Sequence, residues 1–384
     1  MPSSHLRRRR GTVNGMAGGL VTVFACGDVM LGRGVDQILP HPGDPELREN
    51  CAGDARAYVR LAERANGPIP RPASFSWPWG EALAVLDEVA PDARVINLET
   101  SVTRSADFAA GKAVCYRMSP DNLPAVTVAH PDVCVLANNH VLDFGRAGLA
   151  ETLGALAAAE VPAAGAGRDA AQAWQPVAVP VPGGGRVVIV ACGAAASGIP
   201  PDWAATGRRP GVAFLPGLSG AVANDLIARV RAVRQPGDVV VASIHWGSNW
   251  GYGVGRDQVR FAHQLIDGGV DVIHGHSSHH PRPVEVYRGR LVLYGCGDAI
   301  NDYEGISGHE GFRGDLRLLY LASVTADTGT LAALCMVPMQ AKNMRLRHAG
   351  TADGQWMRAA LERTSRRFGS QISHQPDGTL TLRP

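Results

Sequence analysis

The sequence of 384 residues has no apolar run long enough to cross a membrane, which requires about 20 residues. Near the N-terminus, the stretch LVTVFAC (20–26) is apolar, but it leads directly into GDVMLGR without a small-residue cleavage site. The sequence therefore predicts neither a secretory signal nor a membrane span, and we expect a cytoplasmic protein. Because this stretch is short and rich in β-branched residues, it predicts a buried strand instead.

Paired cysteines and net charge are also lacking. The seven cysteines are an odd number without a CxxC pair, which argues against a structural zinc site and a disulfide framework. Buried free thiols in a reducing compartment are expected instead. The formal net charge is only +2, so we predict no nucleic-acid partner. Much of the basic excess lies in Arg7–Arg10, within a segment (1–20) that we predict to be a disordered leader, with Met16 as an alternative start.

What the sequence does contain is an alternation of short apolar runs with helical or Gly/Pro-rich segments, which indicates an α/β protein. Strands are predicted at 21–26, 94–98, 132–137, 186–192, 238–244, 271–273, 290–295, 316–324 and 331–337. Helices are predicted at 79–90, 119–130, 145–160, 219–234, 256–268 and 354–367. Segments 40–78 and 193–217 predict long surface loops. So many strands indicate more than one sheet or one very large sheet, with antiparallel pairing among the later strands.

Polar side chains follow several predicted strands at the point where each strand ends. The set is Asp28, Glu99, Asn138, Asn139, His140, His245, a histidine cluster after residue 273, and Asp298. Ligand sites of open α/β sheets lie at the carboxyl ends of the strands, so we expect these side chains to converge.

The histidine cluster lies in VDVIHGHSSHH, which contains His274, His276, His279 and His280 of the chain's 13 histidines. Gly275 is expected to let the backbone bend there. Imidazole combined with carboxylate and carbonyl oxygen suits Zn, Mn or Fe(II) better than Ca or Mg. We therefore predict one or two divalent transition metal ions and no nucleotide cofactor.

Five motifs occur in a recognisable order: GDVMLGR (27–33), NLETSVT (97–103), LANNHVLDFG (136–145), IHWG (244–247) and DVIHGHSSHHPRPVEVYRGRLVLYGCGD (271–298). Together they resemble the CapA family, which is linked to poly-γ-glutamate capsule synthesis and related to calcineurin-like metallophosphoesterases. The resemblance implies a four-layer α-β-β-α sandwich of two mixed sheets with outer helices. The domain would cover 21–340, and 341–384 would form its C-terminal helical and tail appendage.

The resemblance also implies roles for individual residues. The implied metal ligands are Asp28, Glu99, Asn139, His245, His276 and His279. Among them, Glu99 would bridge two ions. His140 would be a catalytic histidine that binds no metal and acts as a general acid or as a donor to developing charge.

Three features depart from the family pattern. Met30 stands where the parent superfamily has a histidine of the first motif, which would leave the first metal a ligand short. Ser277 stands in strict register with a family ligand, so either His276 substitutes for it or the site loses a ligand. His274 and His280 are left without a clear role. Capsule-type members also usually carry a membrane-anchoring N-terminus, which we do not find here.

Further site residues are predicted in a polar, glycine-rich stretch after the last motif. Asp298 is assigned a catalytic role beside His140, and Asn301 a role in substrate binding. Arg313 suits an anionic substrate group because its planar fork matches carboxylate or phosphate. Trp246 is added to the substrate-binding set, although of Trp246 and Trp250 one is expected to pack and one to shape the entrance.

Three functions stay open at this stage. The first is a soluble, hydrolase-like metal enzyme acting on a peptide or polyglutamate-like substrate by metal and histidine acid/base chemistry. The second is a peptide epimerase of the lasso-peptide type, which deuterium uptake at Cα without bond cleavage would reveal. The third is a non-catalytic capsule-assembly or binding module, which absence of bound metal would favour. The oligomeric state is left open.

Overall fold

The computed structural model describes residues 19–383. The predicted basic leader, with its alternative start Met16, therefore lies almost wholly outside the described residues. None of the helices within residues 19–383 combines the length and apolar character that crossing a membrane requires. All seven cysteines are free, as expected, and Cys51 is the one that is exposed.

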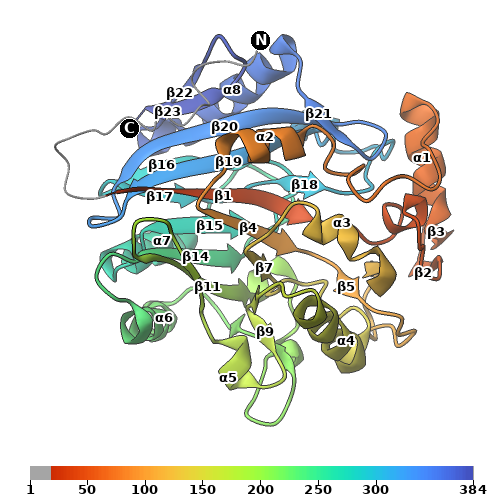
Figure 1. Ribbon diagram of the computed structural model, residues 1–384, viewed down its shortest axis with the longest axis horizontal. Coiled ribbons are helices and arrows are strands. Elements are labelled where there is room, and N and C mark those ends of the chain that lie inside the picture. Colours follow the sequence, from red (N-terminus) through yellow and green to blue (C-terminus); the bar gives the residue numbers. More distant parts are fainter. Residues whose placement is uncertain (1–18, 384) are drawn as a thin grey trace.

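The first sheet joins strands from both ends of the chain, so that red β1 lies beside blue β19 and β20 in Figure 1. Its order is β22 (Gln371–His374), β23 (Leu380–Arg383), β20 (Leu331–Ala341), β19 (Leu316–Thr325), β1 (Leu20–Val29), β4 (Ala93–Leu98), β7 (Val133–Val135) and β8 (Ala163–Ala164). In addition, β18 (Asp298–Ile300) pairs with β1, and β21 (Leu346–His348) pairs with β20. The pairs β1–β4 and β4–β7 are parallel, whereas β1–β19 and β19–β20 are antiparallel.

The second sheet contains the middle of the chain. Its order is β10 (Val177–Pro180), β11 (Arg186–Ala194), β14 (Val239–His245), β15 (Val272–His276), β17 (Arg290–Leu293) and β16 (Val284–Tyr287), with β13 (Phe214–Leu215) beside β11. The four strands from β11 to β17 are parallel, and the edge pairs β10–β11 and β16–β17 are antiparallel. Both sheets are therefore mixed.

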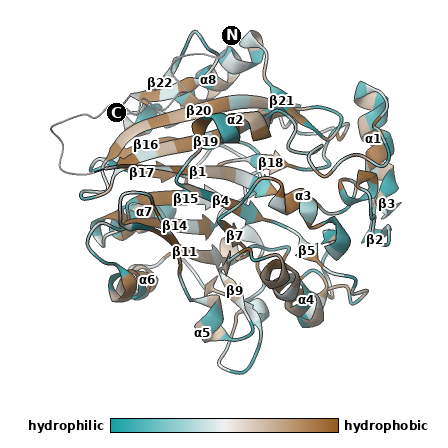
Figure 2. Ribbon diagram, in the orientation of Figure 1, coloured by the Kyte–Doolittle hydropathy of each residue, from teal (hydrophilic) through white to brown (hydrophobic). Residues whose placement is uncertain are grey.

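The two sheets pack face to face because their strands are apolar on both sides. Along β11, Val187 and Ile189 point into the core between the sheets, whereas Val188 and Val190 point into the core beneath helices. This period of two follows from the pleat of a strand. In Figure 2 the central strands are accordingly brown along much of their length, while the helices also carry teal residues. The packing therefore defines four layers, and the predicted α-β-β-α sandwich is confirmed.

Helices cover the outer face of each sheet (Figure 1). Those over the first sheet are α2 (Ala82–Val89), α3 (Pro124–Thr127) and α4 (Gly145–Ala158), while α1 (Arg56–Asn66) lies at the margin of the molecule in Figure 1. Those over the second are α6 (Gly220–Val233) and α7 (Arg256–Asp267), with the short α5 (Ala170–Ala173) nearby. Helix α8 (Thr351–Ser365) places Met357 and Leu361 in the core between the sheets.

The nine predicted strands are all present, but other local predictions were wrong. The expected loop 40–78 contains α1 and the hairpin of β2 (Glu46–Glu49) and β3 (Ala52–Asp54). The expected helix 119–130 is reduced to a 3-10 turn and α3, because Pro120 and Pro124 permit only helix starts there. The expected loop 193–217 contains β13 and β12 (Gly211–Val212), which pairs with β9 (Ala166–Gly167).

Candidate metal and catalytic site

The candidate site lies where strands of both sheets end on the face between the sheets. On β4, Ala93 and Val95 fill the core between the sheets, and Asn97 continues the same face. On β14, Val239 and Val241 do the same, and Ser243 and His245 follow at the same period. Because alternate side chains of a strand share a face, the face that is apolar along each strand carries polar side chains at the strand end. The same rule places His274 and His276 on one face of β15, after Val272.

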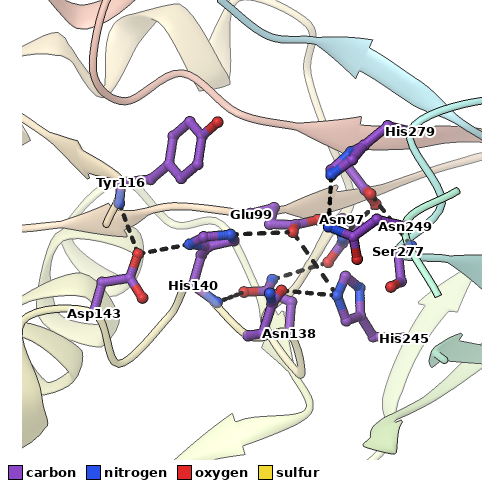
Figure 3. A network of polar contacts seen from close by, with 12 residues as sticks. Asn97, Glu99, Tyr116, Asn138, His140, Asp143, His245, Asn249, Ser277 and His279 are labelled. Carbon is purple, nitrogen blue, oxygen red and sulfur yellow. Dashed lines mark hydrogen bonds and ion pairs between the residues drawn. The ribbon is translucent and has the colours of Figure 1, made fainter. Parts of the chain in front are cut away.

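Two carboxylates of the first sheet are held together by Asn97 (Figure 3). Its Nδ2 donates to Asp28 Oδ1 at 2.8 Å and to Glu99 Oε2 at 3.1 Å. Its Oδ1 accepts from Asn138 Nδ2 at 3.0 Å, which fixes the orientation of the amide. Asn138 Oδ1 in turn accepts from the backbone N–H of His140. The motif residue Asn138 is therefore a support for the carboxylates and for the loop that carries His140.

Both carboxylates are buried, and this makes their charge unfavourable. Burial, together with the nearby Asp298, raises the pKa of Asp28 from 3.8 to about 7. Burial and the proximity of Asp28 raise the pKa of Glu99 well above its usual value. Buried like charges this close require a compensating cation to stay ionised at neutral pH.

A hydrogen-bond chain across the sheets determines which nitrogen of His276 is free. His274 Nε2 must donate to the backbone carbonyl of Cys26, 2.8 Å away, so its Nδ1 accepts from Ser243 Oγ at 3.0 Å. Ser243 Oγ can then accept from His276 Nε2, also at 3.0 Å. This leaves the lone pair of His276 on Nδ1, which faces the candidate site. His274 therefore has both nitrogens occupied and supports a ligand instead of being one.

His245 faces two acceptors with a single proton. Its Nδ1 lies 2.7 Å from His276 Nδ1, and its Nε2 lies 3.0 Å from Asn139 Oδ1. A neutral imidazole can donate to only one of these atoms. A second proton is disfavoured because burial holds the pKa of His245 well below its usual value. A metal ion bound by the facing lone pairs would remove the mismatch, so the donor set fits a transition metal.

Ligand atoms of His245, His276 and Asp28 lie within 4.8 Å of one another. A second group with the same property shares Asp28 and adds His279 and Asp298. His279 Nδ1 lies 2.9 Å from Asp298 Oδ1, and its Nε2 lies 3.2 Å from Asn249 Nδ2. Glu99 lies between the groups and His140, with Oε1 at 3.8 Å from Nε2 of both His140 and His245. One or two ions could therefore be held by groups from both sheets.

His140 is oriented by a carboxylate that lies three residues later in the chain. Asp143 Oδ2 accepts from His140 Nδ1 at 2.7 Å and from the backbone N–H of Tyr116 at 2.6 Å (Figure 3). Lys112 Nζ donates to the other oxygen of Asp143 and to the backbone carbonyl of Asn139. The His140 lone pair is therefore on Nε2, which faces Glu99. Burial lowers the pKa of His140 to about 4, which favours the neutral ring.

The structure brings together the six residues predicted as metal ligands, with His140 and Asp298 beside them. It also explains the departure at Ser277, whose hydroxyl donates to the backbone carbonyl of Gly247 and whose N–H donates to Asp28 Oδ2. The predicted bend at Gly275 was wrong: β15 continues through this residue, and the positive φ of 99° belongs to Ser277. Glycine is needed at 275 because a Cβ would lie 2.5 Å from the carbonyl oxygen of Leu293.

Two of the predicted substrate-binding residues are placed differently from our expectation. Trp246 is buried, its indole N–H donates to the backbone carbonyl of Tyr294, and its ring packs in the core beneath α7. The tryptophan beside the site is Trp250, 5.4 Å from the ring of His279. Arg313 is paired with Asp315 and Asp353, so its charge is already compensated. Asn301 does lie at the site and donates to Asp298 Oδ2 at 2.5 Å.

Comparison with known proteins shows the family to which the chain belongs. The sequence model of the family described as "Bacterial capsule synthesis protein PGA_cap" matches residues 22–303. The chain belongs to this family. A "Probable polyglutamine synthesis accessory protein" of Mycobacterium tuberculosis (strain ATCC 25618 / H37Rv) is 53% identical over 366 residues, which cover 95% of this chain and 96% of the relative.

Two further capsule synthesis family relatives come from Bacillus. The "PGA biosynthesis protein CapA" of Bacillus subtilis (strain 168) is 29% identical and covers 54% of this chain and 52% of the relative. The "Capsule biosynthesis protein CapA" of Bacillus anthracis is 26% identical and covers 73% and 60%. The crystal structure of TT1561 from Thermus thermophilus covers 80% of this chain and 100% of that chain at 9% identity. Its TM-score of 0.35 is too low to support an argument.

Proposed function

We propose that this capsule synthesis family member is a metal-dependent enzyme that acts on a peptide or polyglutamate-type substrate. The proposal rests mainly on His245, which faces lone pairs on both sides and has one proton to share. The raised pKa values of Asp28 and Glu99 support it, because the charges of His279 and Lys112 do not offset the burial of these carboxylates, and a bound cation would stabilise their ionised forms. The predicted catalytic pair, His140 and Asp298, lies beside these groups.

His140 is the residue that we assign to proton transfer. Asp143 holds the ring through Nδ1–H, so Nε2 is left free to accept a proton from a nucleophile or substrate and to return it to a leaving group. Lys112 and the backbone N–H of Tyr116 keep Asp143 in place. A bound divalent ion would polarise a substrate oxygen as a Lewis acid. Asp28 and His276 would hold such an ion through atoms that other residues orient.

The type of substrate is inferred from the relatives. Their names connect them with polyglutamine, PGA and capsule synthesis. A γ-linked glutamate chain offers amide carbonyls as the reacting groups and a free carboxylate on each unit. Amide hydrolysis is the reaction that we propose, since His140 can serve in turn as base and acid.

The test begins with metal analysis of the purified protein, followed by incubation of the metal-loaded protein with γ-linked glutamate oligomers. We expect a transition metal and release of free amines, and we expect His140→Gln to lose turnover while it keeps the metal. Incorporation of deuterium at Cα without cleavage would replace hydrolysis with epimerisation. Phosphate release from a phosphoester as the main activity would instead favour the chemistry of the phosphoesterases. A protein that holds no metal, and whose melting temperature Mn and Zn leave unchanged, would be a binding module.

A further inference from the structure

A cavity of about 420 Å³ opens beside the second group of candidate metal ligands. Two of its lining residues contact that group: Asn301 donates to Asp298, and the Tyr303 hydroxyl lies 3.4 Å from His279 Nε2. Another wall is formed by Trp250, which stacks on His309 with ring centroids 3.8 Å apart. The cavity is therefore continuous with the residues that we assign to the reaction.

Arg317 also lines this cavity, at the start of β19. Its neighbours on the strand, Leu316 and Leu318, point into the core between the sheets, and Arg317 points to the opposite face with Leu319. β1 and β19 pair as far as Cys26 and Leu319, after which β18 pairs with β1 and places Asp298 opposite Asp28. Arg317 is thus located at the same end of the first sheet as the candidate metal ligands.

The guanidinium of Arg317 is buried and incompletely satisfied. The residue is 1% exposed, and its Nε has no hydrogen-bond partner. Its NH1 group donates to the backbone carbonyls of Gly314 and Leu316, which carry no formal charge. Burial is also the main cause that lowers the pKa of Arg317. Burying a cation without an ion-pair partner costs free energy. A negative group that binds the Arg317 guanidinium would therefore recover a large part of that cost.

Two other charged groups at the cavity already have partners. Arg313 is ion-paired with Asp315 and Asp353. Glu304 accepts hydrogen bonds from the backbone N–H groups of Asn343 and Met344 and from the side chain of Asn66. Together with Asp298 and Asp315 it favours the charged form of Arg317 through its charge, but burial outweighs this effect.

We propose that this cavity binds a carboxylate of the substrate through Arg317, at a position next to the bond on which the enzyme acts. The inference deepens the proposed function, on which it rests, because it assigns an acidic peptide to the same site. The guanidinium fork can receive a carboxylate through two parallel N–H···O bonds. The stacked rings of Trp250 and His309 would pack against the apolar part of the same unit.

The test is calorimetric binding of a γ-linked glutamate trimer to the metal-loaded protein, with His140→Gln as the background that prevents turnover. We expect the same trimer with its carboxylates converted to amides to bind at least tenfold more weakly. We expect Arg317→Gln to weaken binding of the acidic trimer at least tenfold. The variant should then bind the two trimers with equal affinity. Arg313→Gln, which removes a charge that is already paired at the same cavity, should change the affinity less than threefold.

Two outcomes would overturn the inference. In the first, the His140→Gln protein, which serves as the parent, binds the two trimers equally. In the second, adding Arg317→Gln to this parent leaves its affinity for the acidic trimer unchanged. Inorganic phosphate that binds more tightly than the trimer in an Arg317-dependent manner would also reject a carboxylate site. If Arg317→Gln does not fold, the comparison of the two trimers on the parent protein still decides. Failure of the proposed function would give a different result. The wild-type protein would then hold no metal and show no turnover, yet it would still bind the acidic trimer in a manner that depends on Arg317.

Discussion

The raised pKa of Asp28 predicts a specific pH dependence of stability in the metal-free protein. A carboxyl whose folded-state pKa is raised contributes stability that is complete below its unfolded pKa and is lost as the pH rises through the folded value. For Asp28 this window extends from 3.8 to about 7. At about 1.4 kcal/mol per pKa unit, the cost to folding is about 2 kcal/mol at pH 5 and about 4 kcal/mol at pH 8.

Asp28→Asn cannot ionise and should escape this cost. In the presence of a chelator, the difference in unfolding free energy between the variant and the wild type should therefore shift by about 2 to 3 kcal/mol in favour of the variant from pH 5 to pH 8. The histidines with lowered pKa values are present in both proteins. Asp28 raises the pKa values of Glu99 and His279, so these two groups titrate differently in the variant and shift the difference in the same direction. Urea unfolding at the two pH values measures the shift.

The same variant separates metal binding from other causes. At pH 8, metal at 100 times its dissociation constant should stabilise the wild type by about 2.7 kcal/mol and the variant by less. A difference between variant and wild type that stays constant from pH 5 to pH 8, within about 0.5 kcal/mol, would refute the assignment of Asp28 as a carboxyl destabilised by burial and by its neighbours.

Three further predictions concern residues in and around the candidate metal site. His140→Gln should reduce turnover at least 100-fold and leave the metal content unchanged; loss of metal would make His140 a ligand. Ser243→Ala should weaken metal affinity about 10- to 100-fold, because His276 loses the contact that orients it. Ser323→Ala, in the first sheet, is the control and should leave the affinity unchanged. Titration with Mn or Zn measures both affinities. Lys112→Met removes a cation that lowers the pKa of His140, so the acid limb of the pH–rate profile should move to higher pH; an unchanged limb would contradict this role.

The fold and the convergence of the candidate site residues could be predicted from the sequence because both depend on local patterns. Buried strands are short apolar runs, and polar residues at their ends meet at one edge of the sheets. Asn97 carried a signal that we overlooked, since it continues the apolar face of Ala93 and Val95 and cannot face solvent there. Asp143 also lies only three residues after His140, within the same motif.

Other parts of the site depend on contacts between distant segments and have no local signal. The pairing of Arg313 with Asp353 depends on how α8 folds back onto the sandwich, so the sequence could not show that its charge is compensated. Arg317 lies within a run of strand residues, and only the arrival of β18 beside β1 reveals that its guanidinium reaches a cavity. The burial of Trp246 likewise reflects its contact with Tyr294 on a different loop.

The candidate site forms only when the two sheets are packed together. Asp28 belongs to the first sheet, whereas His245 and His276 belong to the second, and no ligand group is complete within one of the sheets among the described residues. His274 connects them directly, since it donates to the backbone carbonyl of Cys26 across the interface. An ion held from both sides would oppose separation of the sheets, so its binding free energy would add to the stability of their packing. The buried carboxylates destabilise the metal-free protein at the same place. Under the proposed function, the buried carboxylates would lower the stability of the metal-free protein and raise its affinity for a metal. The core between the sheets would then supply the stability that these carboxylates cost.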